Sequence, residues 1–208
     1  MLTYTKNDNR RRGILMMLLA CLFFSLMDSV MKKLAGHYPA IQVTAMRALT
    51  SMPQIIAYVL WRRALPGLWQ VRWPLHLLRV GLGVVMLTSF AFAIKSLPLT
   101  EAYALFFVSP LFIAALSIPL LGERVHRASW IAIGCGMAGV LVVLKPTGAG
   151  IISLAGLAIL FSASCYALSA ITVRLLSRTD SSESMVFWLM LGVSLVATAA
   201  AWPAWRGV

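Results

Sequence analysis

The sequence is poor in charge, and above all in acidic residues. Its 208 residues include 6 Asp and Glu against 18 Lys and Arg, and charged residues make up 12% of the chain while hydrophobic residues make up 61%. An average globular domain carries roughly twice that share of charged residues. The composition therefore excludes an ordinary water-soluble domain and predicts a membrane protein.

Cysteine and histidine are also scarce, and this bears on metal sites and catalysis. Cys21, Cys135 and Cys165 lie in three different apolar segments, so no two of them have the spacing of a metal site or of a disulfide in a loop. The three histidines lie near the ends of separate apolar segments and form no catalytic cluster. We therefore expect no metal, no cofactor and no enzymatic activity.

Long apolar runs are what the sequence has instead. A helix needs about 20 mostly apolar residues to cross a bilayer, and backbone groups in lipid must be satisfied within helices or closed barrels. We therefore predict an all-α, polytopic membrane protein with about seven transmembrane helices, whose short loops favour the antiparallel packing of consecutive helices. The predicted spans are 13–34, 39–61, 76–96, 99–122, 128–145, 151–176 and 184–203. A seven-helix photoreceptor is excluded because the last span contains no lysine.

Basic residues between the spans predict the orientation of the chain. More Lys and Arg residues lie in the N-terminal tail and in the loops on the same side of the membrane than in the loops on the opposite side. Because basic residues are enriched on the cytoplasmic side, this places 1–12 in the cytoplasm. Since these charges serve the topology, we expect a lipid bilayer as partner and no nucleic acid.

A weak internal repeat divides the chain after the fifth span. A shift of 141 residues places the stretch from Leu18 over the stretch from Ile159. Because five spans is an odd number, the second unit enters the membrane from the opposite face, as in the inverted repeats of transporters. We predict a cytoplasmic tail at 1–12, a five-helix repeat at 13–146 and a partial second, inverted repeat of two helices at 150–208.

Several motifs carry a family resemblance. The stretches "LPLTEAYALFFVSPLF", "LGERV", "WIAIGCGMAGVLVVLKP" and "MRALTSMP" resemble the EamA-type repeat of the drug/metabolite transporter superfamily. Within it, "MDSVMKKLAG" and "HLLRVGLGVVML" look closest to the S-adenosylmethionine uptake carriers. The resemblance implies transport of small organic solutes or metabolites, such as S-adenosylmethionine or amino-acid-like compounds, by alternating access in the bacterial inner membrane.

The same resemblance implies ten spans, whereas this sequence predicts seven. One alternative is therefore a truncated, inactive or partner-dependent fragment of such a carrier. A chain that works with seven spans is expected to form a homo-oligomer or to bind a partner that supplies the missing second half.

Two ionisable residues within spans are candidates for the solute path. Asp28 and Arg47 both lie roughly 8–12 Å below the outer rim, so their side chains can meet. Ionisable groups at this depth are costly and are often functional. A cavity wall, a proton-linked carboxylate and a purely structural ion pair all remain open.

Aromatic residues and a proline complete the candidate set. Tyr103, Phe107 and Pro110 share a predicted helix face beside a kink at the proline, and Tyr166 is the aromatic candidate in the second repeat. Lys95 and Glu101 flank the outer turn "SLPLT" and form either an outer gate or a solvated pair. The substrate-path candidates are Asp28, Arg47, Tyr103, Phe107, Pro110 and Tyr166.

Overall fold

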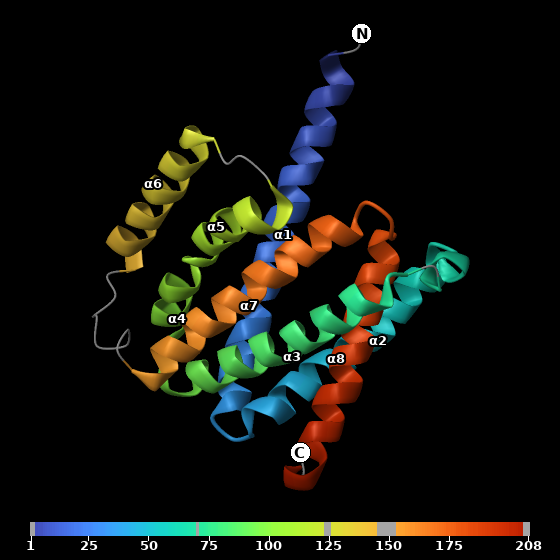
Figure 1. The fold of residues 1–208 in the computed structure, drawn as a ribbon, viewed down its shortest axis with the longest axis vertical. Helices are drawn as coiled ribbons and strands as arrows, with labels where there is room; N and C mark the ends of the chain where they lie inside the picture. The colour runs from blue at the N-terminus through green and yellow to red at the C-terminus, as the bar shows by residue number, and fades with distance from the viewer. Residues whose placement is uncertain (1–2, 70, 123–125, 145–152, 206–208) are drawn as a thin grey trace.

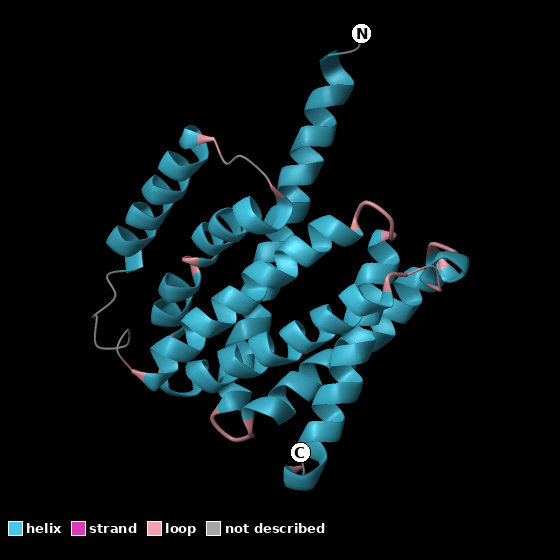
Figure 2. Cartoon of the chain, viewed as in Figure 1, coloured by secondary structure: helices cyan, strands magenta, loops and turns pink. Residues whose placement is uncertain are grey.

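The described part of the chain folds entirely into helices. The computed structural model describes residues 3–69, 71–122, 126–144 and 153–205. Its helices are α1 Thr3–Ala35, α2 Ala40–Trp61, α3 Trp73–Ser96, α4 Leu99–Phe106, α5 Ser109–Leu121, α6 Arg127–Leu144, α7 Leu154–Leu176 and α8 Ser182–Ala201, with short 3-10 turns at Leu65–Leu68 and Trp202–Ala204 (Figures 1 and 2). Because α4 and α5 divide one predicted span between them, the prediction of an all-α protein with seven helical segments is confirmed.

Five of these segments are long and apolar enough to cross a membrane. They are Gly13–Ala35, Trp73–Ser96, Leu99–Leu121, Leu154–Leu176 and Ser182–Ala201. The helices at two further predicted spans, α2 and α6, are not among them. Helix α2 is not among them because a series of polar residues lowers its hydropathy. Some of these residues face a hollow described below.

The first helix begins earlier than predicted. It starts at Thr3, so most of the predicted tail at 1–12 continues the helix of the first span. The stretch from Thr3 to Arg12 contains neither glycine nor proline, and each further residue of an existing helix adds a hydrogen bond. The close of the fourth span at Glu123 and Arg124 lies outside the described residues.

The main packing joins helices that are far apart in the sequence. The most extensive contacts are those of α3 with α7 and of α2 with α8. Consecutive helices such as α2 and α3 also contact each other, as expected, but these contacts are smaller. A small residue also brings α3 and α8 close together, because a Cβ at Gly192 of α8 would overlap the side chain of Val80 on α3, and such residues let helix backbones approach closely.

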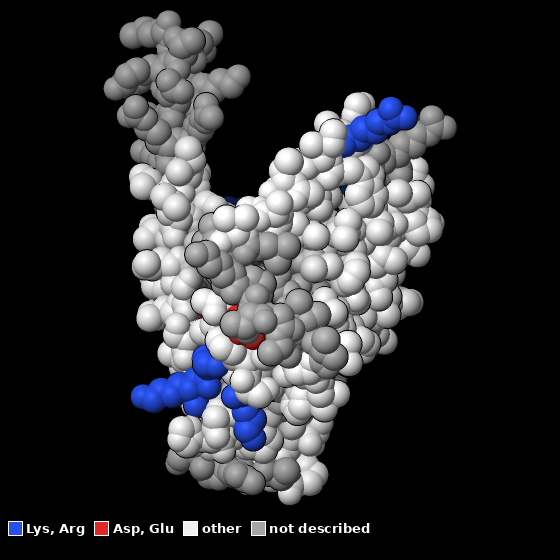
Figure 3. All heavy atoms as spheres, turned by 90° about the vertical axis from the view of Figure 1, so that its left-hand side faces the viewer, with Lys and Arg blue, Asp and Glu red and all other residues white. Residues whose placement is uncertain are grey.

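The core lies where α1, α3, α4 and α7 converge. Ile94 and Ile159 are fully buried there, and Phe90 and Leu105 pack against them. By contrast, most of α1 from Ile14 to Leu26 is exposed, and its N-terminal half projects beyond the other helices (Figure 1). On the face shown in Figure 3, basic side chains lie toward the lower part and at the upper right of the molecule. The described surface between them is mostly uncharged apart from an acidic group beside the lower basic side chains.

The fourth predicted span is broken rather than kinked. Helix α4 ends at Phe106, and α5 starts at Ser109 with Pro110 in its first turn. The amide groups of Phe107 and Val108 bond to the carbonyls of Tyr103 and Leu105. Proline suits the first turn of a helix because the missing N–H is not needed there, so the chain ends one helix and starts another at this point.

Candidate functional site

Asp28 and Tyr103 join α1 to α4. Asp28 is 8% exposed, and its Oδ2 accepts a hydrogen bond from the Tyr103 hydroxyl. A carboxylate at this depth needs such a donor, because burial without hydrogen bonds would cost several kcal/mol. The pair fixes one wall of a pocket between the helices.

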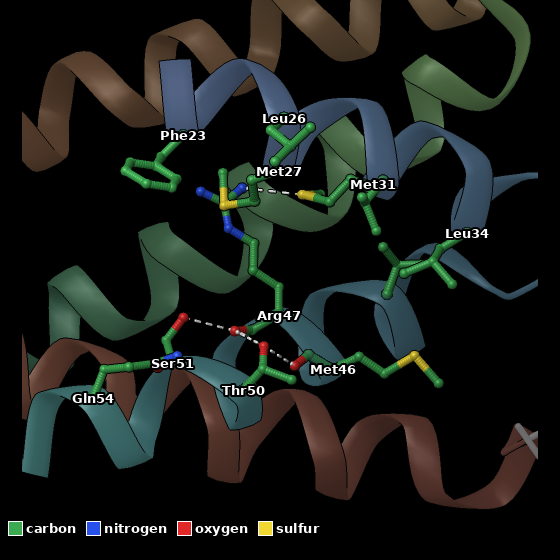
Figure 4. A pocket seen from close by; sticks show the side chains of 12 residues that line it. Phe23, Leu26, Met27, Met31, Leu34, Met46, Arg47, Thr50, Ser51 and Gln54 are labelled. Carbon is green, nitrogen blue, oxygen red and sulfur yellow. Dashed lines mark hydrogen bonds between the residues drawn. The ribbon is translucent and has the colours of Figure 1, made fainter. Parts of the chain in front are cut away.

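Arg47 extends from α2 toward α1. Its guanidinium lies beside Phe23, Met27 and Met31, and Nη1 donates to the Met31 Sδ at 3.3 Å (Figure 4). A thioether sulfur is a weak acceptor. Among the described residues, Asp28 and Arg47 line a common pocket without forming an ion pair within 4.0 Å.

This pocket has a volume of about 180 Å³ and collects side chains from α1, α2, α3, α4 and α7. Its polar and aromatic lining includes Asp28, Arg47, Tyr103, Phe106, Ser162 and Tyr166. We call it the Asp28 pocket. Four of the six predicted path residues are thus brought together from helices of both predicted repeats.

A row of aromatic rings forms one side of the Asp28 pocket. Phe90 lies 6.2 Å from Tyr103 and 5.7 Å from Phe106, and Phe106 lies 5.4 Å from Tyr166, measured between ring centroids. These separations suit tilted and edge-to-face contacts. The wall offers π-surface to a bound molecule, while Asp28 and Arg47 offer charge.

Phe107 and Pro110 lie elsewhere. They line a hollow of about 360 Å³ against α6, together with Ala132 and Gly136. The predicted common face with Tyr103 does not form, because the helix ends at Phe106 and the chain changes direction there. Phe106, which the sequence analysis did not single out, lines the Asp28 pocket instead.

A second, larger hollow lies between α1 and α2. Its volume is about 440 Å³, and Arg47 and Met27 line both this hollow and the Asp28 pocket. We call it the α1–α2 hollow. Thr50, Ser51 and Gln54 of α2 face it (Figure 4), and these polar residues explain why α2 is not among the five long apolar segments.

The predicted outer gate lies at the turn between α3 and α4. Lys95 is exposed and Glu101 is half-buried, and their gating role stays a prediction. The contact that the structure adds is from Lys32 of α1, whose Nζ donates to the carbonyls of Ile94 at 3.1 Å and Leu97 at 2.7 Å. An ammonium at the carbonyl end of a helix is favourable, and here it ties α1 to α3.

A buried polar cluster at the opposite end was not predicted. His76 Nε2 lies 2.8 Å from Asp180 Oδ2, and the two side chains are 3% and 2% exposed. Thr179 Oγ1 donates to Asp180 Oδ1 at 2.6 Å, and the Arg72 amide donates to Oδ2 at 3.3 Å. Burial by itself raises the pKa of the Asp180 carboxyl, but these hydrogen bonds and the charge of His76 outweigh burial and lower it.

Arg79 belongs to the same junction of α3 and α8. It is 6% exposed, and its Nη1 donates to the Met185 carbonyl at 3.2 Å. The sequence analysis did not single out Arg79. Its partner, like that of His76, lies more than a hundred residues away in the sequence, so only the fold reveals either contact.

Comparison with known proteins identifies the family. The model of the EamA-like transporter family matches residues 11–145. The chain belongs to the EamA-like transporter family. It is therefore a multi-pass membrane protein of a carrier family, which agrees with the expectation that it is not an enzyme.

Its relatives in this EamA family have different named solutes. The pseudopaline exporter CntI of Pseudomonas aeruginosa is 29% identical over 94% of this chain and 68% of its own length. A riboflavin transporter of Vibrio cholerae is 29% identical over 94% of this chain and 66% of its own length. The chain thus spans about two thirds of the length of these relatives. No solved structure matches it.

The expected proximity to S-adenosylmethionine carriers needs correction. The S-adenosylmethionine uptake transporter of Rickettsia prowazekii is 25% identical over 93% of this chain, which is less than the identity to the pseudopaline exporter. The two motifs behind that expectation lie in membrane helices, where a shared apolar composition makes sequences alike without a shared solute.

Proposed function

We propose that this chain transports a small organic solute across the bacterial inner membrane by alternating access, through the Asp28 pocket. The observation that carries the proposal is the gathering of a carboxylate, a guanidinium and an aromatic wall among helices of both predicted repeats. Solute sites of secondary transporters lie where such repeats meet. Ionisable residues within membrane helices are a second argument for function.

The contacts at the two ends of the bundle support a gated path. The buried His76–Asp180 pair holds α3 to the turn before α8 at one end, and Lys32 holds α1 to the end of α3 at the other. We place the first of these ends, together with the N-terminus, on the cytoplasmic side. The repeat organisation, with units at 13–146 and 150–208, forms part of the same proposal, and its boundary lies outside the described residues.

The experiment is uptake of radiolabelled riboflavin, S-adenosylmethionine and amino acids into cells that express the 208-residue chain. Asp28→Asn and Arg47→Gln test the pocket. Glu183→Gln and Arg62→Gln are matched controls, because this pair, with side chains 17% and 56% exposed, lies outside the pocket. Saturable uptake that only the pocket variants lose supports the proposal, whereas uptake that both pocket variants retain contradicts it.

A partner-dependent carrier is the second candidate, and one observation favours it. Leu22, Phe23 and Leu26 of α1 are each more than 60% exposed, so this helix has an apolar face that further helices can cover. Uptake that appears only when the part of the pseudopaline exporter that the match leaves uncovered is co-expressed would support this candidate. Uptake by the 208-residue chain alone, with a monomer on size-exclusion chromatography, would contradict it.

A further inference from the structure

The α1–α2 hollow has one charged group in its lining. Arg47 supplies a positive charge there, and the described residues that line the hollow include neither aspartate nor glutamate. Elsewhere the lining is apolar, with Phe23, Met27 and Met31 around the guanidinium, or polar and uncharged along α2 (Figure 4). A monoanion with an apolar body matches this surface in both charge and polarity.

The guanidinium has donors to spare for such an anion. A guanidinium carries five N–H groups in a planar fork that fits a carboxylate, and the acceptor that the structure gives Arg47 is the sulfur of Met31. Asp28, in the neighbouring pocket, attracts the charge of Arg47, but its carboxylate is bonded to the Tyr103 hydroxyl. Among the described residues it forms no ion pair with Arg47 within 4.0 Å. Arg47 is therefore able to bind a carboxylate from outside the chain.

The hydroxyl groups of α2 that line the hollow already donate their hydrogen bonds within the helix. Thr50 Oγ1 donates to the Met46 carbonyl at 2.9 Å, and Ser51 Oγ donates to the Arg47 carbonyl at 2.9 Å. Since these hydroxyl protons are used within the helix, they do not compete for an anion. The charge-assisted hydrogen bond to Arg47 would be the main polar term in binding.

We infer that the α1–α2 hollow binds the carboxylate of a small apolar or aromatic acid, with Arg47 as its anchor. Arg47 also lines the Asp28 pocket, so the bound acid can extend its aromatic part toward the rings of Phe106 and Tyr166. The inference rests on the proposed function in taking this acid as the transported solute. It narrows that function to solutes that carry a carboxylate beside an apolar body.

The test is a binding measurement on the full chain in nanodiscs of uncharged lipid. The probes are 3-phenylpropionate and 3-phenylpropionamide, which differ only in the charged group. Because a charge-assisted hydrogen bond contributes more than a neutral one, we expect the amide to bind about tenfold more weakly or worse. In Arg47→Gln the two probes are expected to bind equally weakly, and in Arg47→Lys the preference for the acid is expected to shrink but to persist.

Two further variants separate this site from a general loss of structure. Arg62→Gln removes an arginine outside the hollow and should leave both affinities unchanged. Thr50→Trp fills the hollow without altering any charge and should abolish binding of both probes. Equal affinity for acid and amide in the unaltered chain, no binding of either, or a preference for the acid that survives Arg47→Gln would each overturn the inference.

Transport measured in liposomes with the same preparations keeps the two proposals apart. Binding that depends on Arg47, without exchange of labelled 3-phenylpropionate, would leave the site standing and contradict the transport function. Saturable transport of another solute that Arg47→Gln does not affect would leave the transport function standing and overturn the carboxylate site.

Discussion

At the scale of single residues, depth in the membrane was the useful signal. Asp28 and Arg47 were paired from their distances to the helix ends, and the structure brings both to one pocket. Tyr103 and Tyr166 reach the same pocket. The actual hydrogen bonds could not be predicted, because whether Asp28 bonds to Arg47 or to Tyr103 depends on side-chain directions that only the packed helices determine.

Removal of the Tyr103 hydroxyl should destabilise the fold. Tyr103→Phe leaves the buried Asp28 without its donor, and an unsatisfied buried group costs about 1–3 kcal/mol. We expect a lower thermal midpoint in detergent. Tyr58→Phe alters an exposed tyrosine and should leave the midpoint unchanged. If Tyr103→Phe were as stable as the unaltered chain even at neutral pH, the hydrogen bond would not contribute to the stability of the fold.

The Asp180 carboxyl should make stability depend on pH in acid. Its pKa is lower in the folded chain than the ordinary value of about 3.9, so its contribution is complete above that value and is lost as pH falls through the folded pKa. We expect the midpoint of unfolding to be level near neutral pH and to fall below about pH 4.

The variant Asp180→Asn tests the origin of this acid sensitivity. It should lower stability at neutral pH by about 1–3 kcal/mol, because it weakens the bonds from His76 and Thr179. It should also flatten the acid part of the pH profile. Glu183→Gln serves as the control, and an unchanged slope in Asp180→Asn would assign the acid sensitivity to other carboxyls.

At the scale of helices, the sequence predicted which segments are helical, and how many, better than it predicted which helices contact one another. Apolar runs show that a segment is a helix in lipid, but they do not show which helix it touches. The break at Phe106 illustrates the limit. Pro110 marked the place, yet a proline inside a bent helix and a proline in the first turn of a new helix look alike in sequence.

The close approach of α3 and α8 should be sensitive to one methyl group. Gly192→Ala places a Cβ against Val80, and overpacking of this kind costs about 1–3 kcal/mol. Gly81→Ala on α3 meets nothing within 4 Å and should be neutral or slightly stabilising. Thermal unfolding of the two variants side by side provides the measurement. Equal midpoints would show that the two helices separate at little cost.

At the scale of the whole molecule, orientation follows from charge. We expect a cysteine at Lys95 to react with a membrane-impermeant maleimide added outside intact cells, and a cysteine at Arg62 to react only after permeabilisation. Both variants are made in a cysteine-free background. Both positions are exposed: Lys95 lies at the C-terminal end of α3, and Arg62 directly follows the C-terminal end of α2. The charge distribution predicts that these two ends face opposite sides of the membrane. The reverse pattern of labelling would invert the proposed topology.

The break between α4 and α5 has a mechanical consequence. Pro110 offers no N–H to bond back to the carbonyl of Phe106, so the helical ladder does not run continuously through this point, and two residues, Phe107 and Val108, carry the change of direction. Such a joint bends at lower elastic cost than an intact helix. Helix α5 can therefore tilt at this hinge while Tyr103, one turn earlier in α4, keeps its hydrogen bond to Asp28.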